Sequence, residues 1–294
     1  MNRRHFTRSI AGAALSTALP GTTLSAANSA QVAPPFKFSV MLWTVFPDLP
    51  FEQRLEKVAE AGYPSVELVK EFEKWSDENF RRFNAKKRAL GITFDATAGV
   101  WKGIADPAAR EAFLSDLNKM LITADKLECP AIIVLSGDRV PGLSHDQQHQ
   151  SCIETLKRGA DVAARRNVTL LLENIDPEEN PKYYLTSVAE GFEIVRAVNH
   201  PRVKFLYDFY HEQIAEGNLI GKLEKNIDEV GLIHVADVPG RHEPGTGEIN
   251  YSNIYRKLAE LNYSRYVAME FMPSGEPVAT LRAARETAMR SAAK

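Results

Sequence analysis

Short apolar segments alternate with amphipathic segments along most of the chain. Residues 37–43 (KFSVMLW) and 65–69 (SVELV) have the length and apolar content of buried strands. Between them, residues 51–61 (FEQRLEKVAEA) place apolar side chains at helical spacing and are followed by Gly62, a helix stop signal. The pattern therefore predicts a strand, a helix and a second strand, and this order repeats to the end of the chain.

Eight strand and helix units of about 30 residues each follow one another. The predicted strands are residues 37–43, 65–69, 92–96, 130–136, 168–173, 203–208, 231–236 and 266–270. The predicted helices are residues 51–61, 76–90, 106–126, 144–166, 187–198, a broken stretch 212–228, 251–261 and 277–293. Strands that are apolar on both faces and flanked by helices indicate a parallel sheet covered on both sides.

Eight such units predict an α/β fold, a single (β/α)8 TIM barrel. An open, doubly wound sheet is the competing interpretation. Against it, no Gly-x-Gly-x-x-Gly motif follows the first strand, and polar residues gather at the ends of many strands instead of at one switch point. No linker or repeat divides the chain after its first 30 residues.

The N-terminal segment has a different composition. Residues 2–8 are cationic, residues 10–19 form a weakly apolar run, and small residues crowd positions 25–30. This is the layout of an export signal. The adjacent Arg3 and Arg4 resemble a twin-arginine signal, which is read by a bacterial exporter of folded proteins.

The apolar run is about ten residues long, whereas a membrane span needs about 20. We therefore expect residues 1–30 to be a cleaved twin-arginine signal peptide and residues 31–294 to be the barrel domain. The mature protein is accordingly predicted to be periplasmic or secreted, with no stable membrane span.

Composition supports a packed globular protein and argues against several classes of partner. Hydrophobic residues make up 44% of the chain and charged residues 25%. The formal net charge is −2, so no global basic field exists to bind a nucleic acid or an anionic membrane. Cys129 and Cys152 cannot form a disulfide framework and are expected to be buried, unpaired thiols. We expect a small-molecule substrate, and the sequence is compatible with a homo-oligomer.

Polar residues at the predicted strand ends suggest a metal site, because catalytic groups of such barrels lie there. Glu173 ends the fifth strand, Asp208 the sixth and Glu270 the eighth, and His234 lies in the seventh. Taken singly, each could be a salt-bridged strand end, a helix cap or a core histidine. Burying three carboxylates together costs several kcal/mol per unpaired ion. We therefore predict that the four side chains bind one divalent metal ion, Mn²⁺, Mg²⁺ or similar.

Three segments carry a resemblance to a known family. Residues 172–177 (LENIDP), 207–219 (YDFYHEQIAEGNL) and 236–251 (ADVPGRHEPGTGEINY) resemble the hydroxypyruvate isomerases. That family belongs to the xylose isomerase-like barrels, with the ketose 3-epimerases and the apurinic endonucleases. The resemblance extends from about residue 36 to the C-terminus and is strongest over residues 170–271.

The resemblance implies a role for each matching residue. Glu173, Asp208, His234 and Glu270 would coordinate the metal, Glu173 and Glu270 would also move the substrate proton, and His211 and Arg241 would hold substrate oxygens. Hydroxypyruvate isomerases usually have glutamine where this chain has His234, as the ketose 3-epimerases do. Residues 67–71 (ELVKE) also lack the aromatic and proline residues of the isomerases, and residues 95–103 differ from their third loop.

The positive groups near the predicted barrel mouth are Arg241 and Lys70, and both are substrate-binding candidates together with Glu248. A guanidinium suits a planar carboxylate, so Arg241 is expected to contact a substrate carboxylate or hydroxyl. The alternative is a salt bridge from Arg241 to Glu243 or Glu248 within its own loop.

These groups predict chemistry on an α-hydroxycarbonyl compound. A divalent ion chelated by the carbonyl and the neighbouring hydroxyl acidifies the C–H between them, and paired carboxylates can remove and return the proton through an enediolate. Return to the adjacent carbon gives isomerisation, as from hydroxypyruvate to tartronate semialdehyde, which is the leading hypothesis. Return to the same carbon gives a ketose 3-epimerase or another polyol or sugar epimerase-isomerase, which His234 favours. A non-catalytic sugar-binding barrel is the third hypothesis. A nucleic-acid enzyme is disfavoured by the charge and by the lack of further histidines for a three-zinc cluster.

Overall fold

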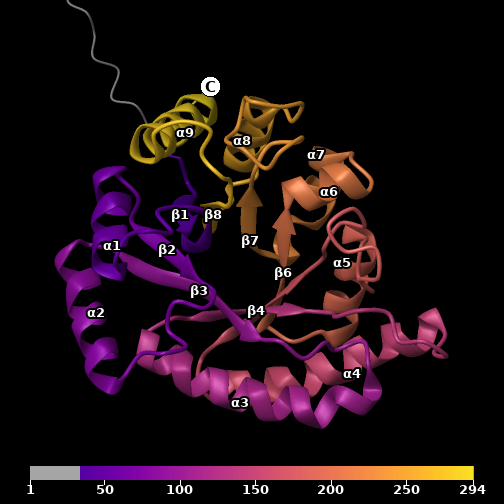
Figure 1. The fold of residues 1–294 in the computed structure, drawn as a ribbon. Helices are drawn as coiled ribbons and strands as arrows, with labels where there is room; N and C mark the ends of the chain where they lie inside the picture. The colour runs from indigo at the N-terminus through magenta and orange to yellow at the C-terminus, as the bar shows by residue number, and fades with distance from the viewer. Residues whose placement is uncertain (1–33, 294) are drawn as a thin grey trace, which may run out of the picture. The chain divides into compact units, whose positions relative to one another are not determined.

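Eight parallel strands close into a barrel in the computed structural model, which describes residues 34–293 (Figure 1). The strands are β1 (Lys37–Met41), β2 (Ser65–Leu68), β3 (Thr93–Val100), β4 (Ala131–Leu135), β5 (Thr169–Glu173), β6 (Val203–Asp208), β7 (Val230–Val235) and β8 (Tyr266–Met269). Each strand pairs with its neighbours in sequence, and β1 pairs with β8 to complete the ring. The predicted (β/α)8 barrel is confirmed, whereas the predicted leader, residues 1–30, lies outside the described residues.

Helices surround the strands, as Figure 1 shows. They are α1 (Phe51–Glu60), α2 (Asp77–Ala89), α3 (Arg110–Leu127), α4 (His145–Ala164), α5 (Val188–Val198), α6 (Phe209–Ala215), α7 (Leu219–Asn226), α8 (Tyr251–Glu260) and α9 (Pro277–Ala292). Short 3-10 turns are η1 (Leu42–Thr44), η2 (Pro107–Ala109) and η3 (Ile227–Glu229). Helix α2 begins as its sequence predicts, because the Ser76 side chain accepts a hydrogen bond from the Asn79 amide in a capping box.

The core has two layers because strand side chains alternate between the two faces of the sheet. In β2, Val66 and Leu68 belong to the apolar layer between strands and helices. Ser65 and Glu67, at the intervening positions, hydrogen-bond to Asp95 and to His234 instead. Polar residues of the strands are therefore directed into the barrel interior, where a site can form.

Several predicted boundaries differ from the structure, three of them in ways that matter for the shape of the barrel mouth or of its helices. Strand β1 ends at Met41, and turn η1 follows, which leaves the Trp43 side chain 40% exposed. Strand β3 continues beyond Ala96 to Val100, with an irregular register against β4. The predicted broken helix is two helices, α6 and α7, separated at Gly217 and Asn218, whose φ angles of 69° and 54° are left-handed.

The structure also bears on the cysteines and on membrane-spanning helices. Cys129 and Cys152 are both buried and unpaired, which confirms the prediction of free thiols. Within residues 34–293, no helix has both the length and the apolar character needed to cross a membrane.

Candidate active site

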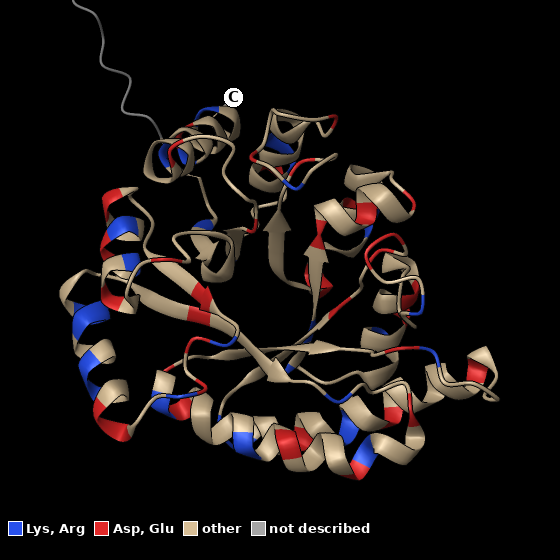
Figure 2. Cartoon of the chain, viewed as in Figure 1, with Lys and Arg blue, Asp and Glu red and all other residues tan. Residues whose placement is uncertain are grey.

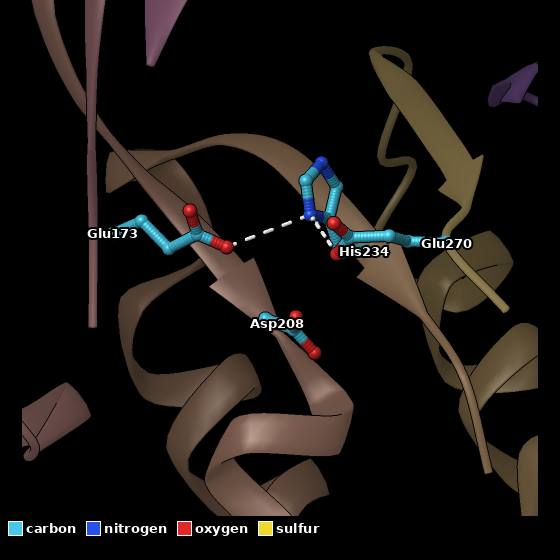
Figure 3. Close-up of side chains that lie close together, drawn as sticks. All are labelled: Glu173, Asp208, His234 and Glu270. Carbon is cyan, nitrogen blue, oxygen red and sulfur yellow. Dashed lines mark ion pairs between the residues drawn. The ribbon is translucent and has the colours of Figure 1, made fainter. Parts of the chain in front are cut away.

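The four predicted metal ligands converge at one end of the barrel (Figure 3). Glu173 and Asp208 are the last residues of β5 and β6, His234 lies near the end of β7, and Glu270 follows β8. One ligand atom from each residue lies within 4.8 Å of the others, and all four residues are buried. Since the strands are parallel, their carboxyl ends meet at one edge of the barrel, and this brings together residues distant in sequence.

The imidazole of His234 lies between carboxylates. Its Nε2 is 2.9 Å from Oε2 of Glu67, in hydrogen-bond geometry. Its Nδ1 lies 2.7 Å from Oε2 of Glu270 and 3.5 Å from Oε1 of Glu173. Burial alone lowers the pKa of His234, but the charges of Glu270 and Glu67 outweigh this and raise its pKa well above the ordinary value.

The donor atoms of this cluster fit a divalent ion. Oδ2 of Asp208 is buried and has no hydrogen-bond partner among the described residues. Nδ1 of His234 and Oε2 of Glu270, which face the same space, pair with each other, with Glu173 and with Arg241. Buried polar atoms are normally satisfied, so the free carboxylate oxygen beside this charged pair leaves room for a cation. Carboxylate oxygens with one imidazole nitrogen are donors that such ions accept. Glu173 completes the set that would hold the ion.

The two outer carboxylates of the cluster have different environments. Burial raises the pKa of Glu173 above its usual range. Burial acts in the same direction on Glu270, but the positive charges of Arg241 and His234 more than compensate and hold the pKa of Glu270 below its usual range. The surroundings therefore shift the pKa values of the two carboxyls in opposite directions.

His211 lies one turn into α6 and contacts two acids. Its Nδ1 is 2.7 Å from Oδ2 of Asp176, and its Nε2 is 3.5 Å from Oδ2 of Asp208. Burial lowers the pKa of His211, but Asp208 and Asp176 together raise it to about 9. Asp208 also caps α6, since its Oδ1 accepts a hydrogen bond from the Tyr210 amide at 2.6 Å. The strand-to-helix junction therefore fixes a carboxylate and a cationic imidazole side by side.

Arg241 projects into the same cluster. Its Nη2 lies 2.9 Å from Oε2 of Glu270 and 3.6 Å from Oδ2 of Asp208, and its Nη1 donates to Oε1 of Glu179 at 2.6 Å. The predicted alternative, a salt bridge to Glu243 or Glu248, is wrong. Glu243 accepts hydrogen bonds from Ser274, Glu248 accepts one from Gln213, and neither forms an ion pair with Arg241 within the described residues.

The loop that carries Arg241 is held from within by Asp237. Its carboxylate accepts hydrogen bonds from the amides of Val238, Gly245 and Ile249 at 2.8 to 3.0 Å. Arg241 itself has a left-handed backbone, with φ of 55°, which a non-glycine residue adopts only when its surroundings impose it. The loop thus fixes the direction of the guanidinium.

Two further substrate-binding candidates lie outside the cluster. Lys70 is exposed, and its ammonium lies 5.1 Å from the centre of the Trp101 ring. Glu248 is exposed, and its hydrogen bond to Gln213 joins the loop to α6. No ion pair joins either residue to the four-ligand cluster within the described part of the chain. Their contact with substrate stays a prediction, as does that of His211 and Arg241.

Three acids that the sequence did not single out complete the surroundings of the cluster. Glu67 orients His234, Asp176 orients His211, and Glu179 pairs with Arg241. Glu67 had a visible signal, since it is a lone charge in the apolar strand segment SVEL, and the period of two directs it to the same face as Ser65. Asp176 and Glu179 lie in a loop, where no periodicity indicates direction.

The contact between Glu67 and His234 gives a testable expectation. Glu67 accepts a hydrogen bond from Nε2 of His234, so Nδ1 of the same ring faces the other ligands. A carboxylate in this position orients a metal-binding imidazole. We expect Glu67→Gln to lower the affinity for Mn²⁺ by about 10-fold to 100-fold, measured by competition with a chromophoric chelator. Ser39→Ala is the matched control, because Ser39 bonds to Asp95 and not to His234. Equal affinity of wild type and Glu67→Gln would contradict this role.

Comparison with known proteins identifies relatives over most of the described chain. A family model described as xylose isomerase-like TIM barrel matches residues 55–292. The chain is 33% identical to a 2-oxo-tetronate isomerase of Pectobacterium atrosepticum, over 82% of this chain and 93% of that protein. It is 30% identical to the hydroxypyruvate isomerase of Escherichia coli, over 84% and 97%. These relatives confirm the expectation of an enzyme of the isomerase class.

Solved structures share the fold. A crystal structure of a family 2 AP endonuclease from Brucella melitensis has a TM-score of 0.75 and 28% identity, covering 84% of this chain and 96% of that one. D-psicose 3-epimerase from Clostridium cellulolyticum, solved with D-tagatose, has a TM-score of 0.71 at 22% identity, covering 88% and 96%. The second similarity concerns the fold alone.

Proposed function

The chain belongs to the xylose isomerase-like TIM barrel family, and from this premise we propose that it is a metal-dependent isomerase of a short hydroxy-carbonyl acid. The observation that carries the proposal is the buried cluster in which Glu173 and Glu270 reach a common space from opposite sides, with Asp208 and His234 between them (Figure 3). The relatives named for hydroxypyruvate and 2-oxo-tetronate, both 2-keto acids, support this substrate class.

The reaction moves one carbonyl group along the substrate. Glu173, Asp208, His234 and Glu270 would hold a divalent ion, and such an ion would supply Lewis-acid polarisation of the carbonyl and the neighbouring hydroxyl. One of Glu173 and Glu270 takes the proton from the hydroxyl-bearing carbon, and the other delivers a proton to the former carbonyl carbon. The hydroxyl proton passes to the former carbonyl oxygen, so substrate and product have the same atoms.

Two cationic side chains are placed to steady the enediolate between these steps. His211, which Asp176 and Asp208 hold in its cationic form, donates to one enediolate oxygen from Nε2. Arg241, fixed by its loop and by Glu179, donates to a substrate hydroxyl beside Glu270. Burial of the cluster excludes water and strengthens these interactions.

The second candidate function is epimerisation of a ketose. The seventh-strand ligand His234 favours it, because the ketose 3-epimerases have histidine where hydroxypyruvate isomerases usually have glutamine. The two reactions use the same two carboxylates and differ in the carbon that receives the proton. Substrate identity and the position of the returned proton therefore distinguish them.

Turnover in D₂O tests both candidates. We expect hydroxypyruvate and 2-oxo-tetronate to be converted with deuterium at C2 of the product, observed by NMR. Deuterium at C3 of a ketose such as D-fructose, with an unmoved carbonyl, would replace the isomerase by the epimerase. If no substrate of either class gains deuterium or is converted to product with Mn²⁺ present, the catalytic proposal is wrong. The non-catalytic sugar-binding barrel is then the hypothesis that remains.

A further inference from the structure

We propose that Lys70 is the residue that recognises the carboxylate of the substrate, in a pocket beside the four-ligand cluster. The inference rests on the proposed function and deepens it, because it makes the acid, and not the neutral sugar, the preferred ligand. Lys70 lies just after β2, in the segment ELVKE.

One side chain links the pocket to the cluster. It encloses about 480 Å³ and is lined by Trp43, Pro47, Arg54, Val69, Lys70 and Glu71. Nε1 of Trp43 donates to Oε1 of Glu270 at 3.2 Å, and the guanidinium carbon of Arg241 lies 5.8 Å from the Trp43 ring. Trp43 is therefore a side chain shared by the pocket and the cluster. In the proposed binding mode, the substrate carbonyl lies on the cluster side of Trp43 and the carboxylate bonded to it lies on the Lys70 side.

The other charges that line the pocket neutralise each other. Arg54 and Glu71 form an ion pair, with Nη2 to Oε1 at 3.3 Å. The second oxygen of Glu71 accepts from the Val69 and Lys70 amides at 2.7 and 3.1 Å, so both oxygens of this carboxylate have partners. That ammonium has no ion pair with any acid in residues 34–293. The lining therefore carries one uncompensated positive charge.

Arg241 is less suited to the carboxylate than Lys70. Its guanidinium already contacts Glu179, Glu270 and Asp208, so its charge is shared among acids within the cluster. A second anion there would add to the repulsion among carboxylates. The single positive charge of the pocket matches one carboxylate, whereas a phosphate ester would bring nearly two negative charges.

One exposed tryptophan contacts the Lys70 ammonium, and a second lines the pocket beside it. Trp101 is 53% exposed and Trp43, which lines the pocket, is 40% exposed. The ammonium lies over the Trp101 ring at 5.1 Å, and such a contact is attractive because of the ring quadrupole. The contact positions the ammonium without using its hydrogen-bond donors fully, so that it can bind a carboxylate.

The test compares two compounds that differ only at the carboxylate. 2-Oxo-tetronate and erythrulose have the same four-carbon chain, with a carboxylate in the first and a hydroxymethyl group in the second. We expect Lys70→Met to raise KM for 2-oxo-tetronate by about 10-fold to 100-fold, since a hydrogen bond to a charged group has this effect. Activity on erythrulose should stay within about twofold of wild type, as expected for a residue that acts only on the carboxylate.

The matched control is Lys74→Met, because Lys74 is exposed on the same connection between β2 and α2 and does not line the pocket. This variant should have wild-type KM values for both compounds. If Lys70→Met leaves the preference for acid over neutral substrate unchanged while wild type isomerises 2-oxo-tetronate, the role of Lys70 is overturned and the proposed function stands.

A binding measurement tests the carboxylate pocket even if the enzyme does not turn over acids. Threonate and threitol cannot be isomerised, and their binding to the Mn²⁺-loaded full chain can be followed by tryptophan fluorescence. We expect threonate to bind more tightly than threitol in wild type and to lose about 10-fold or more of its affinity in Lys70→Met. If threonate binds in this way but no acid is converted by the enzyme, only the proposed function is refuted. Equal affinities for threonate and threitol in wild type would refute the carboxylate pocket, whatever the enzyme turns over.

Discussion

Replacement of either outer carboxylate of the cluster is expected to abolish isomerisation. Glu270→Gln and Glu173→Gln should each lower kcat by about 10³-fold to 10⁴-fold at saturating Mn²⁺, because an amide cannot accept or donate the transferred proton. Glutamine has nearly the volume of glutamate, so the buried positions stay filled. Steady-state assays with hydroxypyruvate and 2-oxo-tetronate give this measurement.

Deuterium exchange distinguishes the two roles. The variant that keeps the abstracting carboxylate should still exchange the substrate C–H for C–D in D₂O without forming product. The other variant should exchange nothing. Glu229→Gln is the control, because Glu229 pairs with Lys204 outside the cluster. Product formation at more than about a tenth of the wild-type rate in either cluster variant would remove that residue from proton transfer.

Removal of divalent metal is expected to abolish activity and to lower the melting temperature while the fold persists. Three carboxylates whose ligand atoms lie within 4.8 Å of one another repel. A divalent cation would add to the compensation that Arg241 gives Glu270 and Asp208 and that His234 gives Glu270 and Glu173. Mn²⁺ at 100 times its Kd stabilises the folded state by about 2.7 kcal/mol. For a domain of this size this raises Tm by about 5–10 °C, which calorimetry can measure. Activity and Tm should recover together when Mn²⁺ is returned to the chelated enzyme.

Asp208→Asn separates metal binding from folding. Asparagine caps a helix as well as aspartate does, so α6 should keep its N-terminus, and the metal-free Tm should stay near that of wild type. The rise in Tm on adding Mn²⁺ should fall by about half or more, because one anionic ligand is gone. Full activity of a chelated, metal-free wild-type enzyme would contradict the metal-dependent mechanism.

Periodicity predicted the eight strand and helix units, because each strand segment is short and apolar and each helix segment has apolar residues on one face. The missing Gly-x-Gly-x-x-Gly motif and the polar residues at many strand ends then favoured the barrel over an open sheet, and the structure confirms the barrel. The errors lie at element ends, such as Met41 and Val100. At those positions turn η1 and the irregular register of β3 depend on packing and not on propensity.

The four-ligand cluster was also predictable. Active sites of these barrels lie at the carboxyl ends of the strands, so residues at four strand ends are expected to be neighbours although they are distant in sequence. Glu173, Asp208, His234 and Glu270 each stand at such an end, and a polar residue there is visible in the sequence. The rule that sites lie at strand ends does not say in which direction each side chain points. It places Lys70 and Glu248 at the same end of the barrel without saying which one faces a pocket.

The sequence by itself determined the strand and helix order, the barrel, and the ligand types at its carboxyl edge, because these depend on spacing and residue chemistry. Only the tertiary structure decided the partners of each charge: Glu67 on His234, Asp176 on His211, and Glu179 with Glu270 on Arg241. Those pairs join side chains from separate strands and loops whose directions depend on closure of the barrel. The same closure neutralises Arg54 with Glu71 and leaves the Lys70 ammonium without an acidic partner in the described chain.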